Sequence, residues 1–99
     1  MMRKVYITGL RPEYREQYIK DHENVPRELL EKYKAAGMKS VAVYLLGDTL
    51  VLITEQEGDR DVRAALANDP VCQAWEERMR PMKSEGDYQE MKEIFRADL

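Results

Sequence analysis

The segment from residue 40 to residue 55 constrains the fold of this 99-residue chain more than any other. Its pattern predicts two strands, residues 40–46 and 49–55, joined by a tight turn at Gly47 and Asp48. A sheet covered by helices on one side only would show polar residues on the other side. Here the first strand is apolar on both faces, and we expect the second face to be covered by a partner subunit or by closure around a pocket. Its two sets of side chains are Val41, Val43 and Leu45 on one face and Ala42, Tyr44 and Leu46 on the other.

Before this hairpin, the pattern predicts one strand and two helical stretches. Residues 3–10 alternate as a strand. Pro12 suits a first helical turn, where its missing N–H is not needed, and the helix should run to about His22. A second helical stretch follows Pro26 and ends at Gly37, which serves as its C-cap.

After the hairpin, the pattern predicts two more helical stretches and a last strand. Residues 59–67 have helical spacing of their apolar side chains. Asp69 is a good N-cap and Pro70 a good first residue for a helix over residues 71–79. A polar loop then leads to a final strand over residues 88–96.

The resulting order is strand, helix, strand, strand, helix, strand. This order is typical of the ferredoxin-like βαββαβ sandwich, an α+β fold with an antiparallel sheet and both helices on one face. We expect residues 1–99 to form a single domain of this kind. The hairpin with two apolar faces favours sheet-to-sheet pairing of two copies into a dimeric α/β barrel.

Composition argues against several classes of function. No apolar run approaches the roughly 18 residues that cross a bilayer. The net charge is −3 with acids and bases interspersed, which argues against nucleic-acid binding. The single cysteine, Cys72, and the single histidine, His22, cannot supply an internal disulfide, a multi-thiolate zinc site or a two-histidine site. The start of the chain lacks the small-residue cleavage site of a signal peptide, and we expect none.

Tyr18 and His22 are the first candidates for chemistry, because they lie four residues apart and so share one helix face. A phenol beside an imidazole can orient a sugar hydroxyl and move a proton, since histidine has an unperturbed pKa of about 6.5. The alternative is structural. Tyr14 and Tyr18 would form the buried stripe of an amphipathic helix, with His22 at its exposed end. Spacing alone favours this second interpretation.

Other residues leave similar alternatives. Trp75 either stacks on a ring-shaped ligand or anchors its helix on the sheet. Cys72 has no neighbouring cation in sequence and is interpreted as a buried, inert thiol. The acidic residues 55–59 are interpreted as a solvated strand end rather than a metal site. A scattered basic group is interpreted as a solvated face: Arg60, Arg63, Arg78, Arg80 and Lys83.

Taken together, these residues resemble the L-rhamnose mutarotase family from about Met2 to Phe95. The Val-Cys-Gln-x-Trp segment and the Tyr-x-x-x-His pair are the more specific parts of the resemblance. The matching residues are Met2-Arg3-Lys4, Pro12, Tyr18-x-x-x-His22, Glu28-Leu29, Gly37, Val43-Tyr44-Leu45, Asp69-Pro70-Val71-Cys72-Gln73-Ala74-Trp75 and Met79.

The resemblance implies a cytoplasmic homodimer that needs no metal or other cofactor. It would interconvert the α and β anomers of a monosaccharide, L-rhamnose or a related deoxy sugar. His22 and Tyr18 would be the catalytic residues. Trp75, Tyr44 and Tyr6 would contact the substrate, and neither nucleic acid nor membrane would be a partner.

The chain departs from the family pattern at three places that are commonly aromatic. Pro26 stands where the family has a Trp-Pro-Glu motif, Val41 lies in a region that often carries an aromatic, and Glu76 replaces a second Trp. Two alternatives therefore stay open: a non-catalytic dimeric α/β-barrel protein that binds a small ligand, and a cofactor-free monooxygenase-like enzyme.

Overall fold

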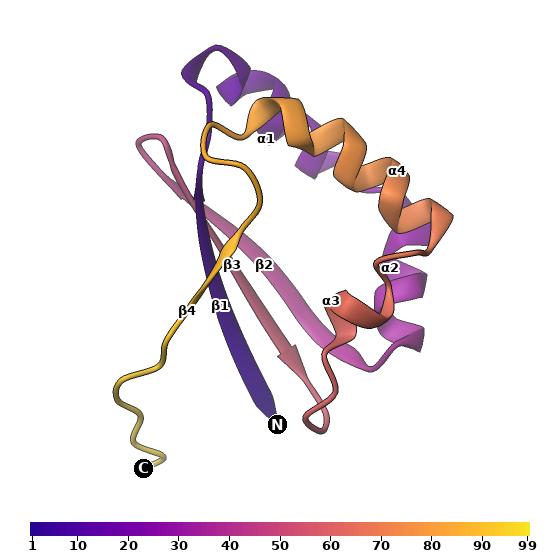
Figure 1. Ribbon diagram of the computed structural model, residues 1–99, viewed down its shortest axis with the longest axis vertical. Coiled ribbons are helices and arrows are strands. Elements are labelled where there is room, and N and C mark those ends of the chain that lie inside the picture. The colour runs from indigo at the N-terminus through magenta and orange to yellow at the C-terminus, as the bar shows by residue number, and fades with distance from the viewer.

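The computed structural model describes residues 1–99 and contains one four-stranded sheet with helices over one of its faces (Figure 1). The strands are antiparallel neighbours in the spatial order β2-β3-β1-β4. In chain order the elements are β1 (Met2–Gly9), the 3₁₀ turn η1 (Pro12–Tyr14), α1 (Arg15–Glu23), α2 (Arg27–Ala35), β2 (Met38–Leu46), β3 (Thr49–Gln56), α3 (Val62–Ala65), α4 (Pro70–Met79), the 3₁₀ turn η2 (Arg80–Met82) and β4 (Gln89–Met91).

Alternation along the strands separates the side chains of the sheet into two faces. Leu52 of β3 lies opposite Tyr6 of β1 and Val43 of β2, and this row faces the helices. The next residues in each strand face the opposite, uncovered side of the sheet. The main buried cluster therefore lies between the sheet and the helices, and consists of Leu10, Tyr18, Leu50, Met79 and Met82.

The predicted ferredoxin-like order is confirmed, and so is the predicted start of helix α4. Helices α1 and α2 form the first crossover, and α3 and α4 form the second. The Asp69 carboxylate accepts hydrogen bonds from the backbone N–H groups of Val71 at 2.9 Å and Cys72 at 3.3 Å. Pro70 is the first helical residue, so α4 begins as its sequence indicates.

Two elements are shorter than predicted. The helical stretch expected over residues 59–67 is reduced to α3, because the Asp61 carboxylate caps Ala64 and so fixes the helix start at Val62. The last strand, expected over residues 88–96, is wrong in extent: β4 pairs with β1 only over Gln89–Met91. Beyond Met91 only the first residues of β1 remain to pair with, and the C-terminal residues extend away from the body, with Phe95 82% exposed (Figure 1).

A buried carboxylate joins α1 to α4. The Asp21 side chain accepts hydrogen bonds from Arg78 Nε at 2.9 Å and Nη2 at 2.8 Å, and from Gln17 Nε2 at 2.7 Å. These hydrogen bonds hold the pKa of Asp21 below its usual range, and the bonding from Arg78 has the largest effect. Arg78 is therefore part of the link between two helices and not simply part of a solvated face.

This link predicts a pH-dependent contribution to stability. Because the pKa of Asp21 is lower in the folded than in the unfolded chain, its contribution is present above the unfolded pKa of about 3.9 and is lost as the pH falls through the folded value. Urea unfolding should therefore show wild type more stable than Asp21→Asn near pH 7, with the gap closing towards pH 3. Asp59→Asn, at an exposed carboxylate, is the control. A gap that is independent of pH would contradict this assignment.

Candidate functional site

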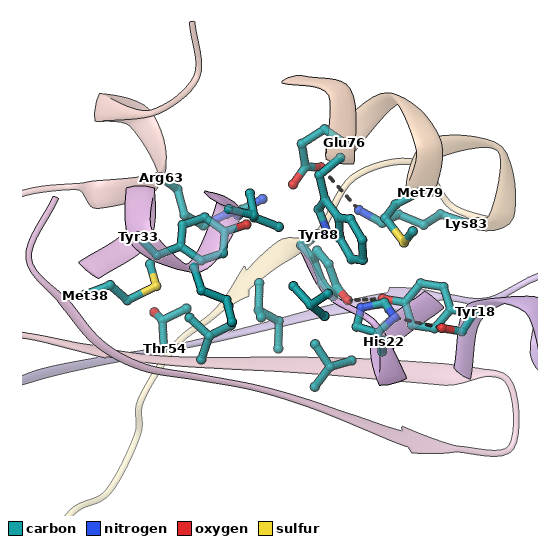
Figure 2. Close-up of a pocket in the computed structure, with 17 residues that line it drawn as sticks. Tyr18, His22, Tyr33, Met38, Thr54, Arg63, Glu76, Met79, Lys83 and Tyr88 are labelled. Carbon is teal, nitrogen blue, oxygen red and sulfur yellow. Dashed lines mark hydrogen bonds and ion pairs between the residues drawn. The ribbon is translucent and has the colours of Figure 1, made fainter. Parts of the chain in front are cut away.

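A cavity of about 310 Å³ lies between the helices and the covered face of the sheet (Figure 2). Its size falls within the range of small-molecule sites. Twelve of the 17 residues that line it are hydrophobic when its three tyrosines are counted among them. The apolar walls are Val25, Leu29, Leu30, Met38, Val41, Val43, Leu52, Trp75 and Met79, and the groups with polar atoms are Tyr18, His22, Tyr33, Thr54, Arg63, Glu76, Lys83 and Tyr88.

The imidazole of His22 is held in a defined orientation. Its ring stacks on Tyr18 with centroids 4.2 Å apart and meets the edge of Trp75 at 5.2 Å. Its Nδ1 lies 2.8 Å from the backbone carbonyl oxygen of Tyr18. Because a carbonyl only accepts hydrogen bonds, Nδ1 carries the proton. In the neutral ring Nε2 then keeps its lone pair and is the nitrogen that can act as a base.

Two phenols stand beside this imidazole. The hydroxyls of Tyr18 and Tyr88 lie 3.1 Å apart and are hydrogen bonded (Figure 2). Burial raises the pKa of Tyr18 far above its ordinary value, and burial is also the main cause of the raised pKa of Tyr88. Both are therefore neutral hydrogen-bond donors near neutral pH. One hydroxyl donates to the other, so one O–H of the pair stays available to a ligand.

Charged groups lie at one side of the cavity. The side chain of Lys83 is only 4% exposed, and its Nζ lies 3.7 Å from Glu76 Oε2 and 3.5 Å from Asp87 Oδ1. The guanidinium of Arg63 lies 4.6 Å from the ring centroid of Tyr6 and 3.5 Å from Asp87 Oδ1. The interpretation of Arg63 and Lys83 as a solvated face is therefore wrong, because long-range packing places Arg63 against the ring of Tyr6 and Lys83 4.4 Å from the ring centroid of Tyr88.

Three of the five residues expected at the site meet in this cavity. Tyr18 and His22 come from α1 and Trp75 from α4. Tyr44 does not line it: it alternates with Val43 and points to the uncovered face, where it is 60% exposed. Tyr6 is buried on the covered face beneath Arg63 and also lies outside the cavity lining.

No local sequence pattern points to the remaining polar groups of the cavity. Tyr88 lies in the loop before β4, 70 residues from Tyr18. Burial raises the pKa of Tyr33, on α2, to about 12, so it too is a neutral phenol near neutral pH. Only contacts between distant segments bring these residues together. The lining residues with polar side-chain atoms that sequence reasoning did not assign to the site are Tyr33, Thr54, Arg63, Glu76, Lys83 and Tyr88.

Three further observations concern metal-binding groups, membrane-spanning helices and the single cysteine. No group of three or more His, Cys, Asp and Glu side chains is placed to hold a metal ion. None of the helices has the length and apolar character needed to span a membrane. Cys72 is buried, and burial is the main cause of the raised pKa of its thiol.

The fold and the cavity together define a small α+β protein in which a tyrosine and a histidine of one helix line a largely apolar pocket. The sequence model of the L-rhamnose mutarotase family matches residues 3–97. An L-rhamnose mutarotase of Klebsiella pneumoniae subsp. pneumoniae is 33% identical over 101 residues, covering 96% of this chain and 97% of that protein. The L-rhamnose mutarotase of Bacillus subtilis is 30% identical over 104 residues, covering 99% and 100%. The chain belongs to the L-rhamnose mutarotase family and is an isomerase of that type.

Solved structures show the same fold. A crystal structure of an L-rhamnose mutarotase from Formosa agariphila superposes with a TM-score of 0.83 at 18% identity, covering 99% of this chain and 100% of the other. An antibiotic biosynthesis monooxygenase gives a TM-score of 0.65 at 15% identity, covering 95% and 99%. At these identities the likeness establishes the ferredoxin-like fold alone.

The bond between Nδ1 of His22 and the Tyr18 carbonyl predicts the tautomer of the neutral imidazole. Nitrogen-15 NMR should show a protonated Nδ1 and an unprotonated Nε2, because only a protonated Nδ1 can donate to the carbonyl. The assignment needs no mutant, since His22 is the single histidine of the chain. A neutral ring protonated at Nε2 would contradict the geometry described here.

Proposed function

We propose that this chain is an aldose 1-epimerase that interconverts the α and β anomers of L-rhamnose or a related deoxy sugar, with His22 and Tyr18 as its acid–base groups. The observation that carries the proposal is the free Nε2 of His22, which the Nδ1 hydrogen bond leaves unprotonated beside an apolar cavity. Family membership supports the reaction and the sugar. A cytoplasmic location is part of the proposal and is supported by the resemblance.

Mutarotation requires two proton transfers and no change of oxidation state. Nε2 of His22 takes the proton of the anomeric hydroxyl, and the phenol of Tyr18 gives its proton to the ring oxygen. The bond between the anomeric carbon and the ring oxygen breaks, which leaves the open-chain aldehyde. After the carbonyl rotates, the ring oxygen returns its proton to Tyr18 and attacks the other face, while His22 protonates the new anomeric oxygen.

The walls of the cavity suit a deoxy sugar. Trp75 and the apolar side chains of Val43 and Leu52 can cover the methyl group and the C–H faces of a pyranose ring. The Thr54 hydroxyl and the Glu76 carboxylate, which also pairs with Lys83, line the cavity where the sugar hydroxyls would lie. Small-molecule sites commonly combine such apolar walls with a few convergent polar groups.

Removing the acid–base groups should slow anomeric exchange without unfolding the chain. His22→Ala should lower kcat by roughly 10²–10⁴-fold, the usual contribution of a positioned acid–base group. Tyr18→Phe keeps the ring and loses only the hydroxyl, and should lower kcat more than it raises KM. Saturation-transfer NMR on L-rhamnose measures both effects. Tyr14→Phe, a phenol outside the cavity, is the matched control. A folded His22→Ala protein with the wild-type rate would remove the histidine from the mechanism.

We further propose that the protein is a homodimer formed by the uncovered faces of two sheets. All four strands contribute apolar side chains to this face, and Leu46 is 84% exposed on it. A contiguous apolar patch of this kind usually marks an interface. A second copy presents the same patch and can cover it about a twofold axis. The residues of the patch are Val5, Ile7, Ala42, Tyr44, Leu46, Val51, Ile53 and Met91.

If two copies pair through this patch, a charge at its centre should separate the subunits. Ile53 lies between Val5 and Ala42, so Ile53→Glu would bury an unpaired carboxylate in the interface. The dissociation constant of the dimer should rise at least about a hundredfold, because each 1.4 kcal/mol of lost binding free energy raises that constant tenfold. Sedimentation at micromolar concentration should give the mass of two chains for wild type and for Ile19→Glu, on the helix side. A wild-type protein with the mass of one chain would contradict the proposal.

A further inference from the structure

The segment from residue 83 to residue 88, between η2 and β4, brings two side chains into the cavity that the mechanism above leaves unused. It is held against the end of β1 and the residue that follows it by three contacts. Lys83 forms an antiparallel bridge with Leu10. The Ser84 N–H donates to the carbonyl of Gly9 at 3.0 Å, and the Thr8 hydroxyl donates to the carbonyl of Gly86 at 3.1 Å. This backbone attachment fixes the positions from which Lys83 and Tyr88 enter the site (Figure 2).

Lys83 is a buried cation with a specific aromatic contact. Its side chain is 4% exposed, whereas its two carboxylate partners, Glu76 and Asp87, are 41% and 69% exposed. Burying a charge is costly unless the charge is paired. The ammonium lies 4.4 Å from the ring centroid of Tyr88, and the guanidinium of Arg63 lies 5.9 Å from the same centroid. Two cations therefore lie close to the ring of one phenol.

That phenol is coupled to the proposed acid. The Tyr88 hydroxyl is hydrogen bonded to the hydroxyl of Tyr18 at 3.1 Å, and both rings line the cavity. When Tyr18 gives its proton to a ring oxygen, Tyr88 is in position to replace it. The negative charge would then be on the half-buried Tyr88, whose ring lies next to Lys83 and Arg63, rather than on the buried Tyr18. The carboxylates of Glu76 and Asp87, which pair with these cations, offset part of this effect.

We propose that Tyr88 is a second catalytic phenol, which passes its proton to Tyr18 during ring opening, and that Lys83 is a positioning residue that holds the Tyr88 ring and favours its anionic form. As the ring opens, the proton of Tyr18 moves to the ring oxygen and that of Tyr88 moves to Tyr18, while His22 takes the anomeric proton. On closure each proton moves back along the same path. This inference rests on the proposed mutarotase activity.

A double-mutant cycle on the two phenols tests the relay. Tyr88→Phe keeps the ring beneath Lys83 and should lower kcat for L-rhamnose exchange at least about tenfold, with KM changed less than about twofold. If the two hydroxyls act as one unit, the Tyr18→Phe/Tyr88→Phe double variant should be no slower than the slower single variant. Tyr14→Phe serves again as the matched control. Independent, multiplicative losses, or a Tyr88→Phe protein with the wild-type kcat, would overturn the relay.

Two Lys83 variants test the positioning role. Lys83→Met should lower kcat about tenfold, and Lys83→Arg should recover part of the loss, because an arginine can keep a cation over the ring. Lys34→Met, on the exposed side of α2, is the control. A loss of stability without a loss of kcat would overturn this role. If Lys83→Met does not fold, Lys83→Arg together with Tyr88→Phe decides the question.

The same experiments separate this inference from the proposed function. A wild-type protein that exchanges the anomers of no aldose would overturn both. A wild-type protein that exchanges L-rhamnose and depends on His22, but not on Tyr88, would leave the mutarotase proposal intact and overturn the relay alone.

Discussion

The alternation of side chains across the β2–β3 hairpin is the constraint on which both faces of the molecule depend. Because successive residues point to opposite sides, Val43 and Leu52 form the floor of the cavity while Tyr44 and Val51 belong to the uncovered face. A shift of register by one residue would exchange the two sets. The same pairing thus decides what a ligand would contact inside one chain and what a second copy would contact outside it.

The chemistry depends on how two helices meet above that floor. The bonds from Arg78 to Asp21 join α4 to α1, one residue before His22 and three residues after Trp75. Within α1 the four-residue spacing puts the His22 ring on Tyr18, and the Tyr18 carbonyl fixes which nitrogen carries the proton. Helix packing and helix periodicity together leave Nε2 as the unprotonated ring nitrogen, which is the one that the proposed mechanism uses as its base.

Much of this arrangement can be predicted from local sequence patterns, and the remainder depends on long-range contacts. Caps such as Asp69 and the turn at Gly47 are local, so the element order follows from the sequence. Trp75 and the Tyr18–His22 pair are assigned to the site through the family resemblance, because spacing alone leaves them open to a structural role. Tyr88 and Lys83 could not be predicted, because they meet α1 and α4 only through a loop that β1 holds in place. Tyr44 was expected to contact substrate although the alternation of its own strand places it opposite Val43 and Leu45.

The central claim is that the sugar binds in the cavity beside His22 and not on the uncovered face. It is tested most directly by titrating isotope-labelled protein with L-rhamnose and following side-chain NMR signals on both faces. If the sugar binds in the cavity, the NMR signals of the Trp75 indole N–H, the His22 ring and the methyl groups of Val43 and Leu52 should show saturable shifts. The signals of Leu46 and Ile53 should be unaffected. Shifts confined to Leu46, Ile53 and Tyr44, in a protein that still exchanges the anomers, would contradict it.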